Sequence, residues 1–143
     1  TLYGGNELMT KVKEKTTPNE PFVSCGEVKK YLNELSNSKY SISPFGWGEL
    51  CPRDFETFIY GAVLIKPNMK TIDTWPNWYI EKKTYLPLSW DFSDFNDQID
   101  FAINNYNKLI KLGINAQKKY LFYTTSEKSK QIFAERFIKL IKN

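Results

Sequence analysis

The sequence contains no histidine, and this absence excludes more chemistry than any other feature of its composition. Histidine is the commonest general base and metal ligand at neutral pH. A serine, cysteine or metal mechanism built around an imidazole is therefore excluded within these 143 residues. With two cysteines, neither a four-cysteine zinc site nor a disulfide framework is expected. Cys25 and Cys51 lie far apart in the sequence, and we interpret both as structural.

Arginine and long apolar runs are also scarce or missing. Only Arg53 and Arg136 are arginines among the 20 basic residues, and the basic residues form no cluster, which argues against a nucleic-acid partner. The sequence lacks an apolar run of about 18 residues, so no transmembrane segment is predicted. It also lacks an Asn-x-Ser/Thr acceptor for glycosylation. These features favour a cytoplasmic protein and leave peripheral association with a membrane open.

What the sequence does contain is an order of elements typical of an α/β domain. We expect one domain over residues 1–143, with a loop-rich or incomplete segment at 1–22. The chain begins at Thr1 without an initiator methionine or a signal-like stretch, and we interpret it as a fragment or an excised domain. Strands that alternate with helices predict a Rossmann-like parallel sheet flanked by helices, followed by C-terminal helices.

The expected elements follow from periodicity and capping signals. A capping box at Ser24 predicts a helix that ends near residue 36, and Pro52 and Gly61 predict the start and end of another. The apolar run 62–65 predicts a buried strand, before a long loop over 66–83. Short strands are expected at 40–43 and 84–88, and helices at 95–112, at 116–122 and from Ser126 onward, with Gly113 ending the first of these.

The segment between residues 43 and 56 has the properties of a phosphate site. Gly46 and Gly48 allow a ligand to approach the backbone closely, and the following helix offers free N–H groups at its N-terminus. Arg53 supplies a fork of donors for phosphate oxygens, and Glu56, one turn further, can accept two hydroxyls of a sugar. The alternative reading is a glycine turn beside an exposed Arg53–Glu56 pair.

Aromatic residues in loops form a second group of candidates. Such rings can stack on a base or a sugar ring, although the Trp75-Pro76 pair equally fits a structural latch over the sheet. The loop aromatics are Trp47, Trp75, Trp78 and Tyr79. Asp91 and Asp94 resemble a carboxylate pair for glycoside hydrolysis, but their place at a helix start favours capping.

Residues 43–94 resemble the C-terminal, donor-binding half of GT-B-type glycosyltransferases. A Phe45-Gly46 turn precedes a helix, and Glu56 stands five residues before Gly61 and the apolar strand at 62–65. The segments 85–88 (Tyr-Leu-Pro-Leu) and 91–95 (Asp-Phe-Ser-Asp-Phe) are similar to segments of the lipopolysaccharide-modifying and protein O-glucosyltransferase group. Group 1 glycosyltransferases share the general pattern.

The resemblance implies a nucleotide-diphosphate sugar as donor and a role in polysaccharide biosynthesis. Arg53 would contact the diphosphate and Glu56 the ribose or the sugar, and both would be catalytic. The donor-binding residues would be Phe45, Gly46, Trp47, Gly48, Arg53, Glu56 and Lys66. No metal is predicted, because no Asp-x-Asp motif is present. The resemblance places the catalytic base of inverting members in an N-terminal half, which we expect to lie outside this sequence.

Two hypotheses about function follow from these observations. The first is a glycosyltransferase domain that transfers a sugar to a glycan, lipid-linked or protein acceptor and is inactive without its N-terminal half. The second is a non-catalytic module that uses its loop aromatics to bind a glycan or a protein.

Overall fold

The computed structural model describes residues 25–142, and the chain divides into two compact units, Thr1–Ser38 and Lys39–Asn143. The expected cap at Ser24 and the expected loop-rich segment at 1–22 lie outside the described residues. In the first unit, helix α2 (Cys25–Ser36) buries Leu32 and Leu35. The Ser36 hydroxyl donates to the carbonyl oxygen of Asn33 at 2.7 Å, where the helix ends as predicted.

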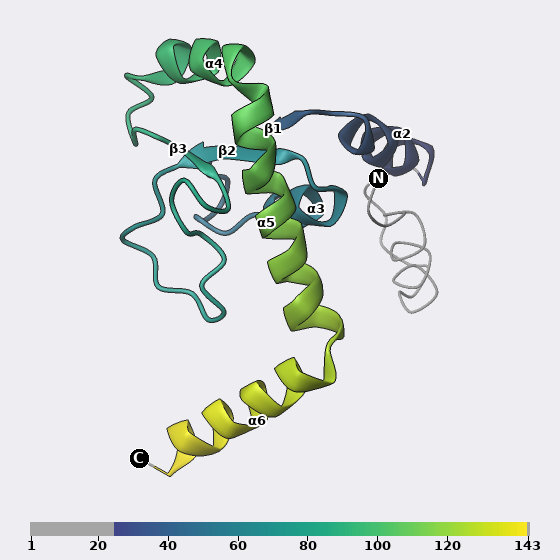
Figure 1. Cartoon of the computed structure of the whole chain (residues 1–143), viewed down its shortest axis with the longest axis vertical. Helices are drawn as coiled ribbons and strands as arrows, with labels where there is room; N and C mark the ends of the chain where they lie inside the picture. The colour runs from purple at the N-terminus through teal and green to yellow at the C-terminus, as the bar shows by residue number, and fades with distance from the viewer. Residues whose placement is uncertain (1–24, 143) are drawn as a thin grey trace. The chain divides into compact units, whose positions relative to one another are not determined.

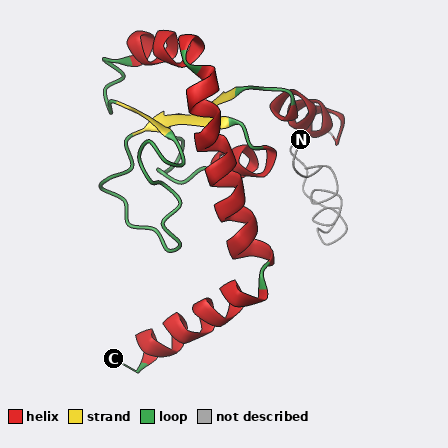
Figure 2. Cartoon of the chain, in the orientation of Figure 1, coloured by secondary structure: helices red, strands yellow, loops and turns green. Residues whose placement is uncertain are grey.

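The second unit contains a small sheet of three parallel strands among its described residues. Strands β1 (Tyr40–Ile42), β2 (Val63–Pro67) and β3 (Leu86–Leu88) lie in the order β1-β2-β3 (Figures 1 and 2). The predicted α/β class, the parallel pairing and the buried strand after Gly61 are confirmed. However, β2 runs on to Pro67, so Lys66 belongs to a strand and not to the loop that the sequence suggested.

Alternate residues of β2 enter two separate cores. Val63 and Ile65 pack with residues of helices α4 (Phe95–Asn104) and α5 (Tyr106–Thr125). Leu64 packs on the opposite side, with residues of helix α3 (Pro52–Tyr60) and of the long segment that joins β2 to β3. Because side chains alternate along a strand, Lys66 falls on the same side as Leu64. The α3 side of the sheet therefore receives a charged group.

Helix α3 begins and ends where the sequence predicts. Pro52 occupies its first turn, and Gly61 follows it with a left-handed φ of 72°. The Gly61 N–H donates to the carbonyl oxygens of Thr57 at 3.0 Å and Phe58 at 3.3 Å, which satisfies groups that a helix end otherwise leaves free.

The expectation that Gly113 ends a helix is wrong. The break falls at Asn105, and α5 runs without interruption from Tyr106 to Thr125, which also includes the expected helix at 116–122. A Cβ atom on Gly113 would lie 2.3 Å from the carbonyl oxygen of Gly61 and 2.9 Å from that of Ala62. Gly113 therefore lets α5 approach the turn between α3 and β2, which explains a glycine inside a helix.

Helix α6 (Glu127–Ile141) begins at the expected cap, whereas the two aspartates before α4 act differently from the prediction. The Ser126 hydroxyl accepts from the Ser129 N–H at 3.1 Å. Asp94 occupies the N-cap position of α4, but its carboxylate accepts from the Ser89 N–H at 2.8 Å and makes no cap hydrogen bond. Asp91 accepts from the Ser93 N–H at 3.1 Å. Both aspartates stabilise the turn after β3.

Candidate functional site

The carboxyl ends of the three strands meet at one edge of the sheet because all pairings are parallel. The segments that leave this edge are 43–51 after β1, 68–85 after β2 and 89–94 after β3. Figure 1 shows the second of these as a long excursion beside the sheet. Ligands of open α/β sheets bind outside this edge, so these three segments are where a ligand is expected.

A buried polar cluster, formed by Ser43, Asp54, Lys66 and Tyr79, lies beneath this edge. The Lys66 Nζ atom lies 3.1 Å from Asp54 Oδ2, and both side chains are wholly removed from solvent. The Tyr79 hydroxyl donates to the same carboxylate oxygen at 2.7 Å. Burial, and then this hydrogen bond, raise the pKa of Tyr79 far above its ordinary value, so the hydroxyl stays protonated and remains a donor.

The Lys66 ammonium also contacts the loop that follows β1. It lies 3.5 Å from the carbonyl oxygen of Ser43 and 5.0 Å from the centre of the Phe45 ring. The Phe45 ring packs on Trp90 with a centroid separation of 4.7 Å, and the Trp90 indole N–H donates to the Asn68 carbonyl at 2.8 Å. Contacts among these residues tie together the segments that follow all three strands.

Two atoms of the cluster have no hydrogen-bond partner among the described residues. They are Asp54 Oδ1 and the Ser43 hydroxyl oxygen, both of which are buried. A buried polar atom without a partner carries a desolvation cost that folding alone does not recover. The two unpartnered atoms at this edge of the sheet therefore lower the free energy of unfolding.

The predicted glycine loop is open to solvent. Gly46, Trp47 and Gly48 are exposed, with the Trp47 side chain standing fully in solvent. A Cβ atom on either glycine would meet nothing within 4 Å. The loop is closed by a hydrogen bond from the Gly46 N–H to the Gly48 carbonyl at 3.3 Å. Its backbone is thus accessible, as a phosphate-binding loop requires.

The other predicted residues lie on α3. Arg53 is exposed in the first turn, and Glu56 lies one turn later, half-buried. The Glu56 charge, after burial, contributes to a raised pKa of Tyr60. Cys51 is a free, half-buried thiol at the N-cap position, and its side chain makes no cap hydrogen bond. Because Lys66 balances Asp54, the exposed charge at the start of α3 is that of Arg53.

The structure brings Phe45 and Lys66 together, but Lys66 is enclosed and already paired. Sequence reasoning missed its ion-pair partner Asp54, and Tyr79, which donates to the same carboxylate. The available signal was a lysine that directly follows the apolar run 62–65. A charge on a buried strand requires an opposite charge nearby, and Asp54 in the adjacent helix is such a residue.

The described residues contain no group of three or more cysteine, aspartate or glutamate side chains placed to hold a metal ion. Within residues 25–142, none of the helices combines the length and the apolar character needed to span a bilayer. Comparison with models of known protein families gives no match, and comparison with curated proteins finds no significant relative.

Proposed function

We propose that this chain is the nucleotide-sugar-binding domain of a glycosyltransferase, a Rossmann-like half of GT-B type. The donor, a nucleoside diphosphate sugar, binds at the carboxyl edge of the sheet. The observation that carries the proposal is the loop 43–51, which has an exposed segment at 46–48 and leads directly into the N-terminus of α3. The Lys66 ammonium contacts the start of this loop at Ser43 and Phe45.

Three groups recognise the diphosphate in this proposal. The exposed backbone at Gly46 and Gly48 approaches the phosphate oxygens, the N-terminus of α3 supplies a positive dipole end, and Arg53 supplies a guanidinium fork. Glu56 accepts hydroxyls of the ribose or of the sugar. Lys66 acts as a positioning residue, because its ammonium contacts Ser43 and Phe45 of the loop.

The same groups favour transfer of the sugar. An acceptor hydroxyl oxygen forms a bond to the anomeric carbon while the bond from that carbon to the diphosphate breaks. The diphosphate leaves with the electron pair, and Arg53 together with the helix dipole stabilises its growing negative charge. The hydroxyl proton goes to a general base, which the resemblance places in a preceding domain.

The proposal is tested by calorimetric titration of the chain with UDP, GDP and ADP. Saturable binding of one of them is expected, weakened about tenfold or more in Arg53→Ala, the loss of about 1.4 kcal/mol or more expected for a charge-assisted contact. Arg136→Ala is the matched control, since Arg136 belongs to α6 and lies 5.1 Å from the centre of the Trp75 ring. Absence of saturable binding, or equal losses in both variants, would contradict the proposal.

A second candidate function, a non-catalytic glycan-binding module, is favoured by one feature, a pocket lined by aromatic side chains. It predicts glycan binding that Arg53→Ala leaves unchanged, together with no binding of any nucleoside diphosphate. The titration described above therefore separates the two functions.

A further inference from the structure

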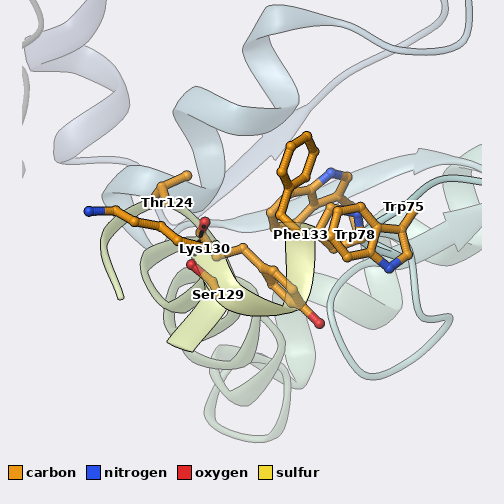
Figure 3. Close-up of a pocket in the computed structure, with 8 residues that line it drawn as sticks. Trp75, Trp78, Thr124, Ser129, Lys130 and Phe133 are labelled. Carbon is orange, nitrogen blue, oxygen red and sulfur yellow. Dashed lines mark hydrogen bonds between the residues drawn. The ribbon is translucent and has the colours of Figure 1, made fainter. Parts of the chain in front are cut away.

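A pocket of about 330 Å³ lies between the segment 75–78 and the corner where α5 meets α6. Figure 3 shows the rings of Trp75, Trp78 and Phe133 gathered together, while the Lys130 side chain extends away from them. The full lining is Trp75, Pro76, Trp78, Tyr123, Thr124, Ser129, Lys130 and Phe133. Its volume is at the lower end of the range of small-molecule sites, which begins at about 300 Å³.

The aromatic walls are fixed by contacts with one another and with α3. Trp78 packs edge-on against Phe55 of α3, with ring centroids 5.9 Å apart, and also against Tyr123 at 5.7 Å. The buried Ser129 hydroxyl donates to the Tyr123 carbonyl at 3.0 Å, which ties the start of α6 to the end of α5. The pocket is therefore formed before any ligand arrives, and binding costs little reorganisation.

The charges around the pocket are balanced or engaged. Lys130 forms an ion pair with Glu127 at 2.6 Å, and the Arg136 guanidinium lies over the Trp75 ring at 5.1 Å from its centre. The lining thus combines the rings of Trp75, Trp78 and Phe133 with two hydroxyl-bearing side chains, Tyr123 and Thr124. The Thr124 hydroxyl donates to the Tyr120 carbonyl at 2.8 Å, so it is left as an acceptor. A ligand that fits this chemistry is uncharged, has one apolar face and carries hydroxyls at its rim.

A platform of parallel rings continues from the pocket along α6. Phe133 and Phe137 are stacked at an interplanar angle of 10° with centroids 6.3 Å apart, and their side chains are 57% and 56% exposed. Because Phe133 lines the pocket and Phe137 stacks on Phe133, the two rings suit a ligand made of successive rings more than a single small molecule.

We propose that this pocket binds an uncharged pyranose ring of a glycan and that the Phe133–Phe137 platform carries the next sugar. A pyranose has a face of C–H groups for the tryptophans and equatorial hydroxyls for the polar rim. The inference rests on the proposed function only in naming this glycan as the acceptor. Phe55 packs on Trp78 of the pocket and lies two residues after Arg53 on α3. Helix α3 therefore contributes residues to the donor site and contacts the aromatic pocket.

The test is a titration of the ¹⁵N-labelled chain with methyl glucoside, methyl galactoside and methyl mannoside, and with linear oligosaccharides of the same neutral sugars, without nucleotide. The expected result is saturable movement of the Trp75 and Trp78 indole signals, with dissociation constants near the millimolar range. Trp75→Ala should weaken binding about tenfold, and Phe101→Ala, which removes an exposed ring from α4, should leave it unchanged.

Further arms separate this inference from its alternatives. Phe137→Ala should lower the affinity for the oligosaccharides and leave the affinity for the monosaccharides unchanged. Loss of folding does not produce this pattern. No saturable shift with any neutral sugar, or equal affinity in Trp75→Ala and the parent, would overturn the proposal. The proposal would also be overturned if the chain bound phosphatidylcholine vesicles and no sugar, because the pocket and the Phe133–Phe137 platform would then be a lipid-binding surface. Trp75→Ala should bind nucleoside diphosphates with the same affinity as the parent. The proposal for the aromatic pocket and the proposal for the donor site can therefore be refuted independently.

Discussion

The Lys66 ammonium lies 3.1 Å from the Asp54 carboxylate, and neither side chain reaches solvent. The pair joins the central strand β2 to the first turn of α3 at the edge where we place the donor. Removing two charges from water is costly, and their attraction offsets that cost only when both partners are present. The pair is therefore better suited to fixing one arrangement of the loop than to adding stability.

The first prediction concerns the loss of one partner. Lys66→Met leaves Asp54 buried without its counter-charge, and we expect the free energy of unfolding to fall by about 3–5 kcal/mol. Urea denaturation followed by circular dichroism measures this change. The double variant Lys66→Met with Asp54→Leu should recover part of the loss. A single variant as stable as the parent would show that the pair does not form.

The second prediction concerns pH. The pKa of Tyr79 is raised far above that of a tyrosine in the unfolded chain. The protonated Tyr79 hydroxyl therefore contributes fully to the free energy of unfolding below a pH of about 10, and this contribution is lost as the pH rises beyond it. The unfolded tyrosine ionises in that range while the folded one cannot. Tyr79→Phe should show a shallower fall in unfolding free energy between pH 9.5 and 11, values set around the ordinary tyrosine pKa of about 10. Equal slopes for both proteins would refute this assignment.

The third prediction compares two glycines. Gly113→Ala places a Cβ atom 2.3 Å from the Gly61 carbonyl oxygen, a backbone atom that moves only with α5 or with the α3–β2 turn. We expect a loss of about 1–3 kcal/mol or more in thermal or chemical unfolding. Gly48→Ala is the control, since nothing lies within 4 Å of its added methyl group, and it should match the parent. The reverse order of stability would be inconsistent with the close approach of α5.

The fourth prediction separates function from stability within the loop. Gly46→Ala and Gly48→Ala should fold as well as the parent, because both positions are open. If the backbone approaches phosphate oxygens here, each added methyl group obstructs the ligand and raises the dissociation constant of the nucleoside diphosphate about tenfold. Calorimetry on the two variants checks this. Unchanged affinity in both would place the diphosphate elsewhere.

The elements that rest on local signals could be read from the sequence. Pro52 and Gly61 bracket α3 because a ring-fixed φ and a left-handed φ are properties of those residues themselves. The buried strand was visible as an apolar run. The candidate loop followed from its glycines and from Arg53, and the structure leaves these residues accessible, while their binding role stays a prediction.

The sequence-based predictions were wrong at positions whose structure depends on contacts with residues far away in the sequence. Gly113 looks like a helix end, but its neighbour is the Gly61 carbonyl, 52 positions earlier in the numbering, and no local pattern contains that contact. The partnership of Asp54 with Tyr79 likewise depends on how the segment after β2 folds back over α3. Trp75, considered as a latch over the sheet, instead contacts Tyr123 of α5 and Phe133 of α6.

The corner at Ser126 has a consequence for the order in which the domain opens. Most of α6 is exposed, whereas α5 is held by the sheet and by the α3–β2 turn. Segments with few buried contacts open at low free energy, so amide hydrogens of α6 should exchange with solvent long before those around Leu109 and Leu112. A sugar held between Trp75 and Phe133 would add buried contacts to α6, and slower exchange along α6 would report its occupancy.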